Sequence, residues 1–199
     1  MKKWLIPLII LVVLAFGIYR WAVGFNNNAI RLGENVSESW GNVQTAYQRR
    51  NDLIGNLVKT VQGAADFERT TLREVIEARS KATSVTIDPT NITPEQLASF
   101  NEVQGGLSNA LSRLLVAVER YPDLKANQNF LKLQDELTST ENTIQTARVR
   151  FNEAIKPYNT HVKTFPNSIL AGWFGFEGKP YFDAEPGAEE PVDVNFEFN

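Results

Sequence analysis

The chain lacks cysteine entirely among its 199 residues. This excludes disulfide bonds, a thiolate nucleophile, cysteine-ligated zinc and a lipid-modified cysteine. Its single histidine, His161, has no Glu-x-x-His pair near it, so the sequence does not support the carboxylate-bridged metal centre that helical bundles often hold. We therefore predict no metal and no cofactor, and we expect His161 to lie in solvent or at a helix end.

A net positive charge and the common catalytic motifs are also absent from the sequence. The formal net charge is -3, which gives no basic surface for nucleic acid. A Gly-x-Ser-x-Gly motif, a P-loop and a Rossmann loop are all missing. The acidic pairs Glu74 with Glu77 and Asp135 with Glu136 have a spacing that equally suits solvated helix faces. We predict that the protein binds no nucleic acid and is not an enzyme.

An apolar run from Trp4 to Phe25, interrupted by one charge at Arg20, is the most informative segment present. Crossing the hydrocarbon of a bilayer takes ~20 apolar residues at ~1.5 Å rise each. A helix that is apolar on every face needs lipid or a large core around it. Residues 1–25 are therefore predicted to form a single transmembrane anchor, with the lipid bilayer as a partner.

A cleaved secretory signal is the alternative interpretation, because Lys2 and Lys3 form a suitable charged start. The small-residue triplets at 15–17 and 22–24 are followed by aromatic or apolar chain, so neither is a convincing cleavage site. We favour an uncleaved anchor. Positive charges before the run slightly exceed those after it, so the positive-inside rule predicts a single-pass membrane protein with its bulk outside the cytoplasm.

Residues 26–182 are predicted to form one helical domain. No proline occurs between Ala29 and Ala82, and apolar residues recur there at steps of three, four or seven. A linker over residues 83–93 leads to Thr93-Pro94-Glu95-Gln96, a capping box with proline at the first helical position. The second helix therefore begins at Pro94 and extends to Arg120.

A third helix is expected to begin near Asn127, because its apolar stripe from Phe130 to Tyr158 alternates steps of three and four. The predicted fold class is all-α, with a transmembrane helix followed by an antiparallel bundle of three long helices, or four if the first is split. The aromatic segment 165–182 is expected to pack onto this bundle. Residues 183–199 form an acidic tail, either flexible or a strand awaiting a partner.

Polar side chains accompany the apolar stripes of the first and third helices. If these helices are neighbours, the polar side chains form a buried network that fixes their register. The alternative is a polar ligand site. The residues concerned are Arg49, Arg50, Asn51, Asp52 and Asn56 in the first helix, and Arg148, Arg150, Asn152 and Asn159 in the third.

Several short motifs occur in a fixed order along the chain. They include RRNDLIGNLV at 49–58, LREVIEARSK at 72–81, ERYPDL at 119–124 and NFLKLQDEL at 129–137. Together they resemble the LemA family. The resemblance implies one amino-terminal transmembrane helix and a helical bundle commonly described as four-helix, and it implies no defined activity. Where the family usually has proline this chain has Gly55, so the first helix is either continuous or split there.

Two functions are compatible with these features. The favoured one is a membrane-anchored scaffold that binds partner proteins or copies of itself, and the alternative is a ligand-binding protein or enzyme with a site in the bundle core.

A continuous helix over 29–82 would be roughly 80 Å long, about twice the length of the second helix. Part of its stripe would then be uncovered, and we expect that part to pair with another copy or partner, unless the helix folds back at Gly55. The residues of this stripe are Val36, Trp40, Val43 and Tyr47.

Overall fold

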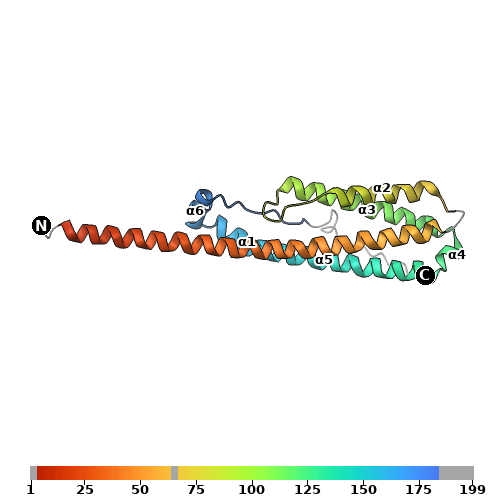
Figure 1. Cartoon of the computed structure of the whole chain (residues 1–199), viewed down its shortest axis with the longest axis horizontal. Coiled ribbons are helices and arrows are strands. Elements are labelled where there is room, and N and C mark those ends of the chain that lie inside the picture. Colours follow the sequence, from red (N-terminus) through yellow and green to blue (C-terminus); the bar gives the residue numbers. More distant parts are fainter. Residues whose placement is uncertain (1–3, 64–66, 184–199) are drawn as a thin grey trace, which may run out of the picture.

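The fold is all-α, as the sequence predicts. A computed structural model describes residues 4–63 and 67–183, and within these ranges it contains helices and no strand. Figure 1 shows an elongated bundle from which one helix projects far beyond the others. The helices are α1 (Leu5–Gln62), α2 (Arg69–Ser84), α3 (Pro94–Val118), α4 (Pro122–Lys125), α5 (Gln128–Lys163) and α6 (Asn167–Phe174).

The projecting helix α1 joins the apolar run to the bundle without a break. It has 58 residues, which corresponds to about 87 Å at ~1.5 Å per residue. Its side chains from Leu5 to Tyr19 are exposed, whereas Phe25 and Ala29 are buried in the bundle. Among the described residues α1 is the one helix long and apolar enough to cross a membrane.

The helix expected over 29–82 is split, but not at Gly55. α1 ends at Gln62 with Gly63 as its cap, and α2 begins at Arg69. Gly55 instead lets the Arg79 side chain pass close to the backbone of α1. A Cβ atom at this position would lie only 3.2 Å from an Arg79 guanidinium nitrogen. The Arg79 Nε donates a hydrogen bond of 2.8 Å to the Asn51 carbonyl oxygen. Glycine at this position therefore serves α1–α2 packing rather than a helix break.

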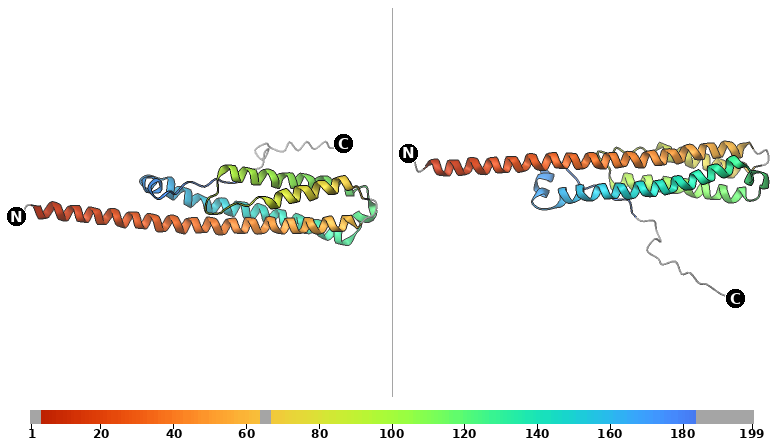
Figure 2. Two further views of the ribbon diagram at one scale, coloured as in Figure 1. Left: turned by 45° about the horizontal axis from the view of Figure 1, so that its top comes forward. Right: turned by 90° about the horizontal axis from the view of Figure 1, so that it is seen from below.

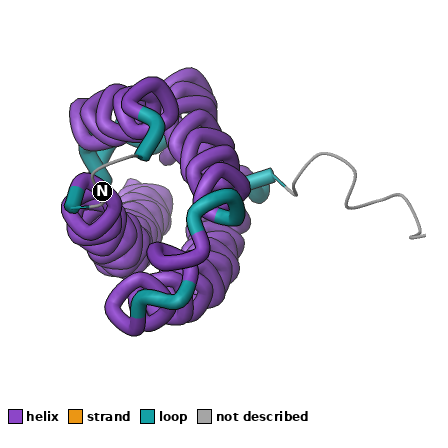
Figure 3. Tube along the Cα trace, turned by 90° about the vertical axis from the view of Figure 1, so that its right-hand side faces the viewer, coloured by secondary structure: helices purple, strands orange, loops and turns teal. Residues whose placement is uncertain are grey.

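Four helices, α1, α2, α3 and α5, make up the bundle. Figure 3 shows the helices side by side in an end-on view. The predicted capping box is confirmed: Gln96 N donates to Thr93 Oγ1 at 3.2 Å and Thr93 N donates to Gln96 Oε1 at 3.0 Å. Asn127 caps α5 as expected, accepting from the next helical N–H groups. α5 continues past Pro157 to Lys163, so it is longer than the stripe predicts.

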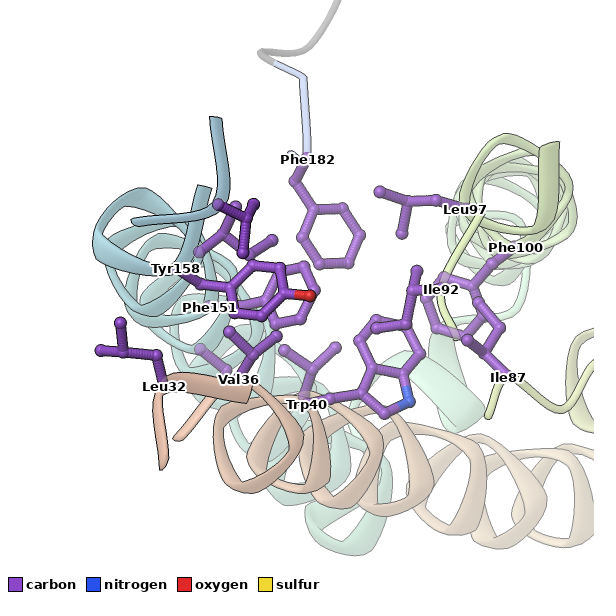
Figure 4. Close-up of a cluster of buried hydrophobic side chains, with 14 of the residues drawn as sticks. Leu32, Val36, Trp40, Ile87, Ile92, Leu97, Phe100, Phe151, Tyr158 and Phe182 are labelled. Carbon is purple, nitrogen blue, oxygen red and sulfur yellow. The ribbon is translucent and has the colours of Figure 1, made fainter. Parts of the chain in front are cut away.

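The apolar side chains form two buried clusters along the bundle. The distal cluster is mainly aliphatic and includes Leu57, Leu107 and Leu114. The second cluster lies at the end of the bundle next to the candidate span, and we call it the membrane-proximal cluster. It is rich in aromatic side chains, and Figure 4 shows how they converge from several elements. Trp40 on α1, Phe151 on α5 and Phe182 from the last described segment lie within 6.0 Å of one another between ring centroids.

The stripe expected to be uncovered is buried in the chain's own core. Val36, Trp40 and Val43 have no exposed surface, and Tyr47 is also buried. The helix that covers this part of α1 is α5, which is long enough to do so, rather than the shorter helix α3. The linker between α2 and α3 and Phe182 complete the cover (Figure 4). The expected pairing of this stripe with another copy is therefore wrong, because its side chains are not on the surface.

The aromatic segment is divided between core and surface. Leu170, Ala171 and Phe182 are buried, as expected for packing onto the bundle, but Phe165 and Trp173 are exposed. Gly175, at φ +75°, ends α6 in the left-handed conformation that glycine adopts without a Cβ clash. From the tail expected over 183–199, only Asp183 lies within the described residues.

Candidate functional site

The polar side chains predicted to form one network between the first and third helices instead make two separate sets of contacts. The first surrounds Arg50, whose residue surface is only 4% exposed. Its guanidinium donates to Gln104 Oε1 at 2.5 Å, to Ser108 Oγ at 3.1 Å and to Glu141 Oε2 at 3.3 Å. It also lies over the Tyr47 ring, 4.9 Å from the centroid. Arg50 thus joins α1 to both α3 and α5, which fixes the register of the three helices.

Both terminal nitrogens of the Arg50 guanidinium donate hydrogen bonds to oxygen atoms of the protein. Gln104 in turn donates from Nε2 to the Ala82 carbonyl oxygen at 3.3 Å, extending the contacts to the end of α2. A groove of about 410 Å³ lies beside Arg50, Ser108 and Glu141. Because three side chains already accept hydrogen bonds from the Arg50 guanidinium, we interpret this network as fixing the register of the helices rather than binding a ligand.

The second set of polar contacts attaches the segment after α6 to α5. Asn159 makes a reciprocal pair with Lys179: Asn159 Nδ2 donates to the Lys179 carbonyl oxygen and Lys179 N donates to Asn159 Oδ1, each at 2.8 Å. Asn152 makes the same reciprocal pair with Phe182, at 2.9 and 2.8 Å. Arg148 donates to the Asp183 carbonyl oxygen at 3.1 Å and lies over the Phe182 ring. These side chains satisfy the backbone of an extended segment that pairs with no strand in the described part of the chain.

Lys179 connects that segment to the α2–α3 linker. Lys179 is a buried residue, and its Nζ donates to the carbonyl oxygens of Thr90 at 2.7 Å and Pro89 at 3.2 Å. Burial lowers the pKa of the Lys179 ammonium, and the nearby Asp88 carboxylate partly opposes this effect. The pKa of Asp88 is itself lowered, chiefly by the hydrogen bond from the Thr90 hydroxyl. The contacts of Lys179 hold the linker over the membrane-proximal cluster.

A small pocket lies between α1 and the linker, with a volume of about 180 Å³. Two polar atoms of its lining residues, Trp40 Nε1 and Asn51 Oδ1, have no hydrogen-bond partner among the described residues. Figure 4 shows the Trp40 ring nitrogen directed away from Phe182. The acidic pairs considered from the sequence, Glu74 with Glu77 and Asp135 with Glu136, do not line this pocket. Glu74 is exposed and forms an ion pair with Arg113 at 3.0 Å.

His161 lies in the last turn of α5, so it is at a helix end as expected. It is half-buried and bridges α5 to α1, where α1 emerges from its apolar run. His161 Nε2 lies 3.0 Å from the Phe25 carbonyl oxygen, which only accepts, so Nε2 carries the proton and Nδ1 accepts from Asn28 Nδ2 at 3.1 Å. The imidazole also stacks on the Phe25 ring at 4.8 Å. The sequence signal for this site was the asparagine run 26–28 directly after the apolar residues.

The same end of the bundle carries α6, which lies against α1 (Figure 2). Trp21 Nε1 donates to Asn167 Oδ1 at 3.3 Å, and the Phe25 and Phe174 rings are 6.3 Å apart. A shallow groove of about 670 Å³ runs between α1 and α5 here. Arg31, Lys156 and His161 are among the residues that line it. We take this membrane-proximal end, formed by α1, the end of α5 and α6, as the candidate functional site.

Metal binding has no support at this end or elsewhere in residues 4–63 and 67–183. No group of three or more His, Cys, Asp or Glu side chains comes together there. The polar residues of the candidate site are instead neutral amides, one imidazole, exposed cations and two threonines whose hydroxyls donate to backbone carbonyl oxygens of α5. Such a set can hold two helices together and present positive charge, but it offers no nucleophile with an adjacent base.

Comparisons with known proteins place the chain in a family. Residues 39–196 match the model of the LemA family. The magnetosome protein MamQ 2 of Paramagnetospirillum magneticum is 26% identical over 183 residues, covering 83% of this chain and 67% of that protein. Protein LemA of Metamycoplasma hominis is 26% identical over 189 residues, covering 94% of this chain and 82% of that protein. The matched region contains most of the bundle, the Arg50 network and the segment held by Asn152 and Asn159, and the chain belongs to the LemA family.

Proposed function

We propose that this protein is a non-catalytic scaffold that holds its bundle at a fixed distance and angle from a membrane. One observation carries the proposal: α1 runs from Leu5 to Gln62 as one helix, first as an apolar span and then as a core helix of the bundle. A flexible linker between anchor and domain would let the domain move freely. A continuous helix transmits the orientation of the span to the bundle instead.

The contacts at the membrane-proximal end support a rigid connection. Trp21 and Phe25, in the last turns of the apolar run, already contact α6 and His161. α1 is therefore braced before it leaves the proposed membrane span. The polar groups inside the bundle mostly contact one another, which favours a structural role for the core over a catalytic one. The partners that such a scaffold would bind are other proteins, on the outer faces of the bundle.

Rigid coupling can be measured with two spin labels in this cysteine-free chain. We expect labels on Val13→Cys and Val149→Cys to give one narrow distance distribution in reconstituted membranes. Val149 lies two residues before Phe151, whose ring packs against Trp40 of α1, so its label is near the level of Trp40. The distribution should therefore be centred at roughly 40 Å, the length of α1 from Val13 to Trp40 at ~1.5 Å per residue. Pulsed electron paramagnetic resonance measures this distance. As a control, Asn27→Pro at an exposed position of α1 should shift or broaden the distribution. A broad distribution in the chain without that proline would contradict a rigid scaffold.

Membrane attachment and orientation are part of the same proposal. A reporter that is active only in the cytoplasm, fused after Asn199, should stay silent, because positive charges before the span modestly exceed those after it. The fusion should also remain in the membrane pellet through carbonate washing, because the apolar run is long enough to span. A strong reporter signal would show that residues 26–199 lie in the cytoplasm, opposite to the proposed orientation. A soluble product starting after Gly17 or Gly24 would instead show that the run is a cleaved signal.

A further inference from the structure

The short helix α6 lies at the level of α1 where the apolar run ends. Two contacts fix this level: the hydrogen bond of 3.3 Å from Trp21 Nε1 to Asn167 Oδ1, and the stacked rings of Phe25 and Phe174. Both α1 residues belong to the final turns of the run that begins at Trp4. Figure 2 shows α6 in both views beside α1, at the end of the bundle nearest the amino terminus.

α6 buries one face in the bundle and leaves the other without cover. Leu170 and Ala171 are buried. Trp173 is 79% exposed and Phe165, just before the helix, is 77% exposed, while Ile169 and Phe174 are each about half exposed. The helix Asn167–Phe174 contains no charged residue. A group of large apolar side chains exposed together marks a contact surface rather than an ordinary solvated face.

The position of this surface identifies what covers it. The stretch of α1 from Leu5 to Phe25 is ~31 Å long at ~1.5 Å per residue, which matches a hydrocarbon core of about 30 Å. Trp21 and Phe25 are then at the boundary between hydrocarbon and headgroups, and α6 is at the same depth. Tryptophan and other aromatic side chains favour that boundary. The exposed face of α6 is thus continuous with the lipid-facing surface of the span, which favours lipid over a second copy of the chain.

The charges near α6 fit the same arrangement. Arg31 lies about 9 Å beyond Phe25 along α1, from the same rise per residue, and therefore at headgroup depth. Arg31 and Lys156 line the groove next to α6, and among the described residues neither forms an ion pair with a carboxylate. Cations at this depth are attracted to lipid phosphates. Apolar side chains at the boundary and positive charge just above it are typical of a membrane-surface helix.

We infer that α6 is a second membrane contact: it lies in the membrane interface with Phe165, Ile169 and Trp173 among the lipids. This inference rests on the proposed membrane anchor. Together, α1 and α6 attach the bundle at two adjacent points, so that its membrane-proximal end rests on the bilayer and its rotation about α1 is restricted. The exposed aromatic side chains that look unfavourable in water are then covered by lipid.

Spin labels at single introduced cysteines test this depth in the full chain, reconstituted in phosphatidylcholine vesicles. Collision with oxygen, which concentrates in lipid, is compared with collision with a water-soluble nickel complex. We expect the oxygen-to-nickel ratio at Ile169→Cys and Trp173→Cys to exceed that at Val116→Cys by several-fold. Val116 is the matched control, because it is a large apolar residue, 71% exposed, on α3. A label at Val12→Cys in the middle of the span gives the value for lipid.

The outcomes separate this inference from the anchor. If the Ile169 and Trp173 labels match Val116 while the Val12 label reports lipid, α6 is in water and the inference fails although the anchor stands. If the Val12 label is also in water, both fail together. Spin–spin broadening between chains at Ile169, without preference for oxygen, would show a second copy covering α6 and would overturn lipid contact. Near-ultraviolet circular dichroism of each variant checks that its core remains packed.

Discussion

Replacing Phe151 by alanine should lower the free energy of unfolding by about 3–5 kcal/mol. Phe151 has no exposed surface and lies 5.3 Å, between ring centroids, from both Trp40 and Phe182. Its removal leaves a cavity between α1, α5 and the segment after α6, and three elements cannot all move to fill it. Urea unfolding of the chain in detergent micelles, followed by tryptophan fluorescence and far-ultraviolet circular dichroism, measures the change.

Val149 provides the matched control for Phe151. It lies on the same helix two residues earlier and is 56% exposed. Val149→Ala should change the free energy of unfolding by no more than about 0.5 kcal/mol. Equal losses from the two variants would mean that the membrane-proximal cluster is not the packed core that the structure describes.

Asn159→Ala should cost about 2–4 kcal/mol of unfolding free energy, because it leaves two backbone groups without partners. The N–H and the carbonyl oxygen of Lys179 both bond to the Asn159 side chain at 2.8 Å in a buried position. Losing these bonds should release the segment 175–183, and with it the Lys179 contacts to the linker. We expect faster proteolytic cleavage within 175–183, read by mass spectrometry, together with the lower stability.

Asn142, on the exposed face of α5, is the control for Asn159. Asn142→Ala should leave both the cleavage rate and the stability nearly unchanged. Asn159→Asp should give an intermediate loss, because its carboxylate still accepts from Lys179 N but has no hydrogen to donate to the Lys179 carbonyl oxygen. If Asn159→Ala behaves like Asn142→Ala, the reciprocal pair does not hold the segment.

Much of the local structure was determined by the sequence alone. The helix starts at Pro94 and near Asn127 followed from capping side chains, which act on backbone N–H groups a few residues away. The stripe from Phe130 to Tyr158 predicted the buried face of α5, because helical periodicity depends only on residue spacing. The apolar run likewise predicted a span from its length and composition.

Which surfaces meet was decided only by the tertiary structure. The stripe at Val36 and Trp40 could be identified as apolar, but its partner depended on how far α5 extends beside α1. The same holds for His161, whose bonds to Phe25 and Asn28 join residues more than 130 positions apart in the chain. The break at Gly63, and the close approach of Arg79 at Gly55, depended on how α2 packs on α1. Spacing and caps are local properties that a sequence displays directly, whereas contacts between distant segments depend on how the helices are placed in space.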